Sequence, residues 1–256
     1  NGIMTDQKDN VTLTDFGFAS IPKDEKKSRV RAVFDSVAEQ YDIMNDVMSL
    51  GLHRLWKRFV VAQSGLKTGQ KALDVAAGSG DLSLGLLKRV GPTGRVIVTD
   101  INTAMLRRGR DRLVNAGMAG NVEYAEADAE SLPFKSEVFN CVTIGFGLRN
   151  LTDKSSALRS MHRVLKPGGR VLVLEFSKPN FGPLNRFYDM YSFRVLPKLG
   201  QLLANDAASY QYLAESIRKH PDQEQLKTLM VEQGFERCRY YNLSGGIVSV
   251  HVGFRL

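Results

Sequence analysis

The feature that most restricts the fold is a regular alternation, from Lys71 onward, of short apolar stretches with amphipathic ones. The apolar runs predict strands at 71–76, 95–99, 121–127, 138–145 and 169–176. Between them, apolar residues at three- and four-residue spacing predict helices at 81–90, 103–116 and 153–165. Strands joined by helices pair in parallel through right-handed crossovers, so this part of the chain predicts an α/β fold.

The carboxyl end departs from that alternation. A predicted helix near 222–233 is followed by two strand-like stretches, RCRYYNL (237–243) and IVSVHVGFR (247–255), with only SGG between them. So short a connection suits a hairpin. Upstream, LKPGGR (165–170) predicts a helix stop and a tight turn before the fifth strand. We therefore expect a doubly wound, mostly parallel seven-stranded sheet of Rossmann-like type, with an antiparallel C-terminal hairpin.

The segments outside the alternation are expected to be additions to one domain that spans 29–256. Residues 1–28 are polar and mixed in charge, which favours a flexible terminus, and residues 1–3 precede Met4 as a cloning remnant would. Residues 29–60 have helical spacing and are expected to form a helical cap. The aromatic-rich stretch 178–220 is expected to be a helical insertion that acts as a lid.

Composition narrows the class of protein. A hydrophobic fraction of 43% suits a globular core, and the net charge of +8 can reflect nucleic acid, an anionic membrane or solubility alone. The positive residues are interspersed with acidic ones, so we interpret them as solvated helix faces. The two cysteines, Cys141 and Cys238, have no metal-site spacing and favour a reducing compartment. We expect no bound metal, no membrane span and no signal peptide.

A glycine turn follows the first strand of the alternation. In ALDVAAGSGDLSL (72–84), Gly78 and Gly80 let a ligand approach the backbone at a helix N-terminus. Ser83 stands where a dinucleotide fingerprint has its third glycine, and the lysine of a phosphate-binding P-loop is absent. Asp74 on the strand is placed to stiffen this turn or to face a cationic ligand. A plain strand-to-helix turn remains the alternative.

Acidic residues at the next two strand ends indicate a nucleoside. Asp100 ends the second strand, where a carboxylate accepts hydrogen bonds from ribose hydroxyls in NAD and S-adenosylmethionine sites alike. Asp128 and Ala129 follow the third strand, where a carboxylate and a backbone amide can serve the adenine amino group and a ring nitrogen. Together with Asp74, the glycine turn and LKPGG, this order of signals is typical of class I methyltransferases.

More specific motifs resemble one family. FDSVAEQYDIMND, GLHRLWKR, GSGDL, FGLRN, LKPGG, LEFSKP, NDAASYQYLAESI and HPDQ are similar to those of the ubiquinone/menaquinone biosynthesis C-methyltransferases, and the resemblance runs from about Phe16 to Leu256. It implies methylation of a ring carbon of a polyprenylated quinol, either demethylmenaquinol or a methoxy-polyprenyl-benzoquinol, with S-adenosylmethionine as donor.

The resemblance also implies which residues contact the donor: Ser79, Asp100, Asp128 and Ala129, with Gly145 near the same site. Two of these depart from a common pattern of the family. Gly145 often carries a serine, so a side-chain contact is absent here. Asp128 is often an asparagine, which changes the hydrogen bonding to adenine without abolishing it.

The stretch VTIGFGLRN (142–150) ends a buried strand with an arginine and an amide. Ligands of doubly wound sheets bind at such strand ends, so we hypothesise that Arg149 stabilises a quinol phenolate and that Asn150 orients its hydroxyl or a bridging water. The alternative is that Arg149 pairs with an acid such as Asp153 and only shapes the loop. The general base stays open among five candidates: Asp81, His53, Asp206, Tyr210 and His220.

Other expectations concern the partners. An apolar stripe from Leu184 to Val195 is either core or part of the lid over the quinol tail. A lipid-soluble substrate favours a cytoplasmic protein with peripheral contact at the inner face of the membrane, and a homo-oligomer is also expected. Nucleic acid is not expected as a partner. The competing functions are an NAD-dependent oxidoreductase and a non-catalytic nucleoside-binding module.

Overall fold

The structure, a computed structural model, describes residues 12–37, 41–179, 201 and 206–256. Its centre is a seven-stranded sheet with the order β5-β4-β3-β6-β7-β9-β8. The strands are β3 (Lys71–Val75), β4 (Arg95–Asp100), β5 (Val122–Glu126), β6 (Phe139–Gly145), β7 (Leu165–Phe176), β8 (Glu236–Leu243) and β9 (Val248–Phe254). The first five are parallel, and β9 is antiparallel to both β7 and β8. The predicted sheet and hairpin are therefore confirmed.

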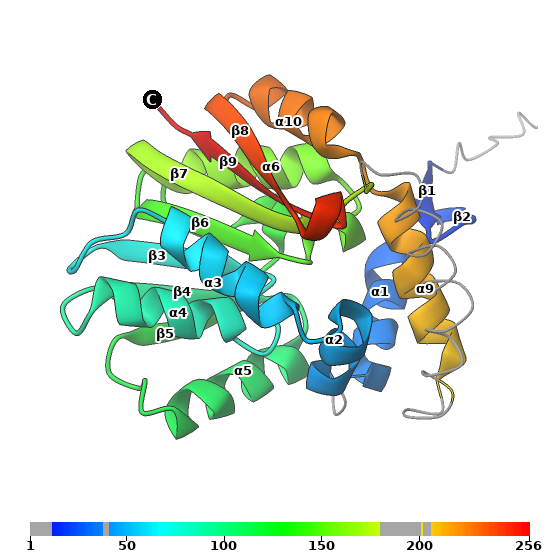
Figure 1. Cartoon of the computed structure of the whole chain (residues 1–256), viewed down its shortest axis with the longest axis horizontal. Coiled ribbons are helices and arrows are strands. Elements are labelled where there is room, and N and C mark those ends of the chain that lie inside the picture. The colour runs from blue at the N-terminus through cyan, green and yellow to red at the C-terminus, as the bar shows by residue number, and fades with distance from the viewer. Residues whose placement is uncertain (1–11, 38–40, 180–200, 202–205) are drawn as a thin grey trace, which may run out of the picture.

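Helices cover both faces of the sheet (Figure 1). They are α3 (His53–Gln63), α4 (Asp81–Val90), α5 (Thr103–Asn115), α6 (Lys154–Val164) and α10 (Gln223–Glu232). Side chains of α3, α4 and α5 pack in one hydrophobic cluster, and those of α6 and α10 pack in another. Alternate residues of β3 divide between the two clusters, Ala72 in the first and Leu73 and Val75 in the second, as the two-residue period of a strand requires.

The amino-terminal part lies at the edge to which the parallel strands point (Figure 1). It contains β1 (Leu13–Phe16), β2 (Ala19–Pro22), α1 (Lys23–Val37) and α2 (Tyr41–Ser49), beside α9 (Ala207–Lys219). Helix α1 contacts α9, β1 and α5. The cap therefore sits over the end of the sheet where doubly wound folds bind their ligands.

Two expectations about local structure were wrong. Residues 12–28 do not form a loose terminus, because β1 and β2 pair as a hairpin whose Phe16 ring stacks on Tyr212 at 4.2 Å, and α1 begins at Lys23. Strand β7 begins at Leu165 rather than 169, since Leu165 pairs with Phe139 before a register shift. Gly168, at φ +78°, makes the expected turn within that irregular strand.

The expected lid, 178–220, is only partly described. Residues 180–200 and 202–205, and with them the apolar stripe from Leu184 to Val195, lie outside the described residues. The described part includes α9, whose N-cap Asp206 accepts a hydrogen bond from the Ser209 amide. The lid and the division of the chain into a cap, a domain and an insertion stay predictions.

Candidate active site

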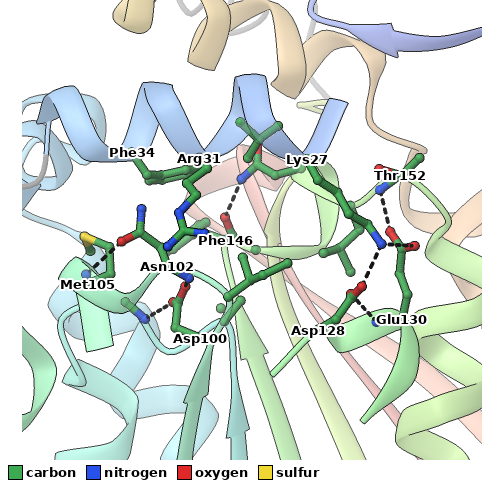
Figure 2. A pocket seen from close by; sticks show the side chains of 18 residues that line it. Lys27, Arg31, Phe34, Asp100, Asn102, Met105, Asp128, Glu130, Phe146 and Thr152 are labelled. Carbon is green, nitrogen blue, oxygen red and sulfur yellow. Dashed lines mark hydrogen bonds and ion pairs between the residues drawn. The ribbon is translucent and has the colours of Figure 1, made fainter. Parts of the chain in front are cut away.

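A cavity lies at the carboxyl ends of β3, β4 and β6, beneath helix α1 (Figure 2). Its floor includes Gly78, Gly145 and Gly147 from the loops after β3 and β6. One wall carries Asp100 and Asp128 from the ends of β4 and β5, and the other side is closed by α1. A cavity therefore lies at the edge of the sheet where the sequence predicts the nucleoside contacts.

The glycine turn takes the shape that its residues favour. Gly80 caps the start of α4 with a φ of +77°. Residues other than glycine rarely adopt this backbone conformation. Beneath the turn, Asp74 is fully buried and accepts hydrogen bonds from Ser83 Oγ at 2.6 Å and Thr143 Oγ1 at 2.7 Å. Burial raises the pKa of Asp74 to about 6, although both hydroxyls favour its ionised form. Asp74 thus stiffens the turn, and it does not line the cavity.

Asp100 joins the glycine turn to the second strand. Its carboxylate accepts hydrogen bonds from the backbone amides of Gly78 at 2.9 Å and Asn102 at 2.8 Å. Burial raises its pKa, and these amide bonds act in the opposite direction. Each oxygen keeps further acceptor capacity toward the cavity, which is what a pair of ribose hydroxyls requires.

Asp128 lies at the far end of the cavity, where α1 covers it. Its Oδ1 accepts a hydrogen bond from the Glu130 amide, and its Oδ2 lies 2.6 Å from Lys27 Nζ. Lys27 also lies 3.2 Å from Glu130 Oε2 (Figure 2). Partial burial disfavours the charged lysine, but the two carboxylates outweigh it and raise the Lys27 pKa. Lys27 therefore fastens α1 across the pocket.

Arg149 and Asn150 lie in the short helix η2 (Leu148–Asn150) but point to different places. Asn150 lines the cavity, and its Oδ1 accepts a hydrogen bond from the buried Tyr212 hydroxyl at 3.1 Å. Arg149 is buried behind the loop, where its guanidinium lies 3.1 Å from Glu175 Oε2 and donates to the Phe146 carbonyl. Its acidic partner is thus Glu175, whereas Asp153 caps α6.

Arg149 faces a second, polar hollow together with Lys26, Lys154 and Tyr212.

The residues predicted to contact the donor do not all line the main cavity. Gly78, Asp100, Asp128 and Gly145 line the main cavity, whereas Ser79, Gly80 and Ala129 lie beside it. Ser79 lines a small adjoining hollow that also contains Gly145, and Ala129 is buried against the core.

None of the five candidate bases lines the main cavity. Asp81 lies 2.6 Å from both Lys57 and Arg112, and these cations overcome its burial and lower its pKa. Asp206 accepts a hydrogen bond from Ser36. His53 pairs with Asp46, while Tyr210 and His220 are buried. The described residues therefore leave the base unassigned.

Comparison with known proteins decides the family. The model of the ubiE/COQ5 methyltransferase family matches residues 22–255. A protein of Marinomonas sp. (strain MWYL1) named "Ubiquinone/menaquinone biosynthesis C-methyltransferase UbiE" is 60% identical, over 97% of this chain and 99% of its own length. Its namesake from Cronobacter sakazakii (strain ATCC BAA-894) is 58% identical over the same shares. This chain belongs to the ubiE/COQ5 methyltransferase family.

Solved structures agree with the family on the fold. A SAM-dependent methyltransferase from Aquifex aeolicus superposes with a TM-score of 0.61 at 16% identity, covering 84% of this chain and 98% of that one. A second, from Thermotoga maritima and described as a possible histamine N-methyltransferase, gives 0.63 at 19% identity, covering 89% and 100%. The predicted family resemblance, the fold class, the methyltransferase assignment and S-adenosylmethionine as cofactor are confirmed.

The contribution of α1 to this cavity was not predicted from the sequence. Lys27, Val30, Arg31 and Phe34 line it from that helix, and Asn102 and Met105 line it from the start of α5. The spacing of Val30 and Phe34 predicted a helix, but it did not predict that this helix packs over the cavity. No motif in the sequence brings Lys27 to Asp128, because that contact depends on how the cap docks.

Proposed function

We propose that this member of the ubiE/COQ5 family transfers a methyl group from S-adenosylmethionine to a ring carbon of a polyprenylated quinol. The main support is the 58–60% identity to relatives named ubiquinone/menaquinone biosynthesis C-methyltransferases. The NAD-dependent oxidoreductase and the non-catalytic module gain no support from any comparison.

The residues of the cavity fit an adenosine-bearing donor. Asp100 offers acceptors for the ribose hydroxyls, and Asp128 offers one for the adenine amino group, while the amide expected to serve a ring nitrogen belongs to Ala129, which lies beside the cavity. Apolar side chains of Ile101, Met105 and Phe34 line the same space and suit a flat base. When bound, the donor supplies an electrophilic methyl group, while the protein binds and orients both reactants and excludes water.

The acceptor carbon must become nucleophilic. A phenol with a pKa of about 10 is mostly protonated near neutrality, and loss of its proton spreads charge onto the ring. Asn150 is placed to act here, because Tyr212 donates to its carbonyl oxygen, while its Nδ2 makes one long hydrogen bond of 3.4 Å to the Phe146 carbonyl and has a second N–H to donate. We propose that this amide orients the quinol hydroxyl or a bridging water.

Arg149 acts less directly in this proposal. Glu175 balances its charge, and the guanidinium lies behind the loop rather than in the cavity. A pair of opposite charges in a low-dielectric region still exerts a dipolar field on a nearby phenolate. We therefore retain Arg149 as an electrostatic contributor and place the direct contact at Asn150.

The decisive test measures transfer of labelled methyl groups to short-tailed benzoquinols and naphthoquinols, each in reduced and oxidised form. Transfer only to the reduced ring is expected, because only the quinol forms a phenolate. The relative rates rank the two ring classes. Equal transfer to the oxidised ring, or no transfer despite donor binding measured by calorimetry, would contradict the proposed acceptor.

The substrate's lipid solubility supports peripheral contact with the inner face of the membrane. No helix in the described part of the chain is long and apolar enough to cross a bilayer. A homo-oligomer and the absence of nucleic-acid binding remain predictions. Vesicle binding by the whole protein is the first of these to test.

A further inference from the structure

Three large apolar side chains are exposed at the corner where α2 meets α3. They are Leu50, Leu52 and Leu55, and the most exposed are Leu50 at 69% and Leu55 at 57%. We call these three residues the corner patch. Single exposed apolar residues are ordinary on protein surfaces, but several together on one corner indicate a site of interaction.

Backbone strain accompanies this exposure. Leu50 has a φ of +51°, a left-handed conformation that residues other than glycine rarely adopt. Folding gains little in return, since the side chain buries little surface. Asparagine or glycine would fit this conformation better and would leave no apolar group in water. A strained, exposed leucine is therefore better explained by a contact outside the chain.

The corner is held in one geometry. The Gly51 amide donates to the Asp46 carbonyl at 2.9 Å, and the Leu52 amide donates to the Ser49 carbonyl at 3.0 Å. The Asp46 carboxylate binds both His53 and Arg54 from the next helix. The patch is consequently presented by a hydrogen-bonded turn, and little ordering is needed when it binds.

The charges beside the patch are mostly positive. Helix α3 contains Arg54, Lys57 and Arg58 and no acidic residue. Lys57 turns inward to Asp81, and the exposed Arg54 lies 2.8 Å from Asp46 of α2, which leaves the exposed Arg58 to meet anionic headgroups. Exposed leucines bordered by arginines match a bilayer interface, where apolar groups enter the acyl region and cations meet anionic headgroups.

The corner is also close to the donor cavity. Trp56, on the buried face of α3, lies 6.2 Å from the ring of Phe146, which lines that cavity. Figure 1 shows α2 and α3 meeting at the edge to which the parallel strands point. A membrane at the corner patch would therefore lie near the site where the proposed acceptor reacts.

We propose that the corner patch is a membrane-docking surface whose partner is an anionic lipid bilayer, with Leu50 and Leu55 entering the acyl boundary. This inference rests on the proposed function for its purpose, because a lipid-soluble quinol must be collected from the bilayer. It can nevertheless be tested separately, since docking does not require turnover.

The test measures flotation of the full chain with vesicles of phosphatidylglycerol and phosphatidylethanolamine. Leu50→Asn removes the apolar group and suits the left-handed backbone, so the variant should fold. We expect it to weaken vesicle binding about tenfold, given the value of one buried leucine. Arg58→Gln should weaken binding about fivefold, and only with anionic vesicles. Val231→Asn changes an apolar residue of α10 that is 53% exposed, and this matched control should bind like the wild type.

Two readouts separate this inference from the proposed function. Leu50→Asn should retain wild-type turnover of a short-tailed quinol in solution but lose turnover of a long-tailed quinol embedded in vesicles. Equal vesicle binding by Leu50→Asn and wild type would overturn the proposal. So would absent vesicle binding together with a dimer that Leu50→Asn dissociates, which would assign the patch to a second copy of the chain.

Discussion

Arg149 was proposed as a catalytic residue from the FGLRN motif, but its ion-pair partner Glu175 lies outside that motif. Both side chains are almost completely buried, and Glu175 also accepts a hydrogen bond from the Arg149 backbone amide. Such a pair contributes little net stability, but removing one member leaves an uncompensated buried charge. Loss of activity on substitution of Arg149 alone would therefore not prove a role in the reaction.

We expect Arg149→Ala to lower the free energy of unfolding by about 3–5 kcal/mol, because Glu175 would be left charged and unpaired in the core. Chemical denaturation measures this change. The double variant Arg149→Met, Glu175→Gln removes both charges and should recover much of the lost stability. An Arg149→Ala variant as stable as the wild type would contradict the buried pair.

The double variant also tests the electrostatic contribution that we propose for Arg149. If it is stable and binds the donor but methylates slowly, the pair supports the reaction. If its turnover is normal, the pair serves only to hold the loop and Asn150 in place.

Helices and strands with strong periodicity were predictable from the sequence, because their burial pattern is local. The predicted helix 81–90 coincides with α4, and 103–116 differs from α5 by one residue. The hairpin β1–β2 was not predictable, since its strands are only four residues long and depend on Phe16 packing against Tyr212. Contacts between residues so distant in sequence leave no local period.

Helix α1 is expected to control access to the donor cavity. Lys27→Met keeps most of the aliphatic stem but removes both ion pairs with Asp128 and Glu130. Because Lys27 is 46% exposed, each pair is weak, and we expect a two- to fivefold loss of donor affinity, mainly through faster release. Stopped-flow displacement of bound donor measures this rate.

Lys88→Met provides the matched control, because Lys88 is an exposed lysine near the end of α4 away from the cavity. It should leave the release rate unchanged. Equal release rates for Lys27→Met and the wild type would show that α1 does not restrain the donor.

The whole molecule buries its titratable groups in a way that makes stability depend on pH. The pKa values of all four histidines, His53, His162, His220 and His251, are lowered, with burial as the largest cause. For His251 the value falls to about 4. Unfolded histidines, with a pKa near 6.5, bind protons first as the pH falls, so the stability from neutral buried histidines is present above about 6.5 and is lost on acidification.

We expect the free energy of unfolding to fall between pH 7 and pH 4.5, and His251→Gln to reduce that fall by up to about 3 kcal/mol.

The contribution of Asp74 to this pH dependence has the opposite sign. Its folded pKa of about 6 lies above the unfolded value, so its contribution is present at low pH and is lost as the pH rises through 6. Asp74→Asn should therefore steepen the acid loss. Denaturation curves across this range measure both slopes, and parallel slopes in all three proteins would contradict the assignment.

The candidate site was predictable only as far as it follows from strand ends. Asp100 and Asp128 could be placed because the carboxyl ends of parallel strands meet at one edge of a sheet. The partners of those carboxylates were not predictable, since Lys27 reaches Asp128 from a helix outside the alternating region. The side on which the Arg149 guanidinium lies depends on Glu175, which belongs to a different strand.

The contacts of Lys27 also bear on the sequence of events in one turnover. If adenine binds beside Asp128 as we propose, the contacts of α1 with Asp128 and Glu130 slow the departure of S-adenosylhomocysteine as well as the escape of the donor. The ion pairs of Lys27 lie beside Asp128 and do not restrain the acceptor, which can exchange while the nucleoside stays in place. Such an arrangement favours a compulsory order of binding and release. The donor enters first, and S-adenosylhomocysteine leaves last.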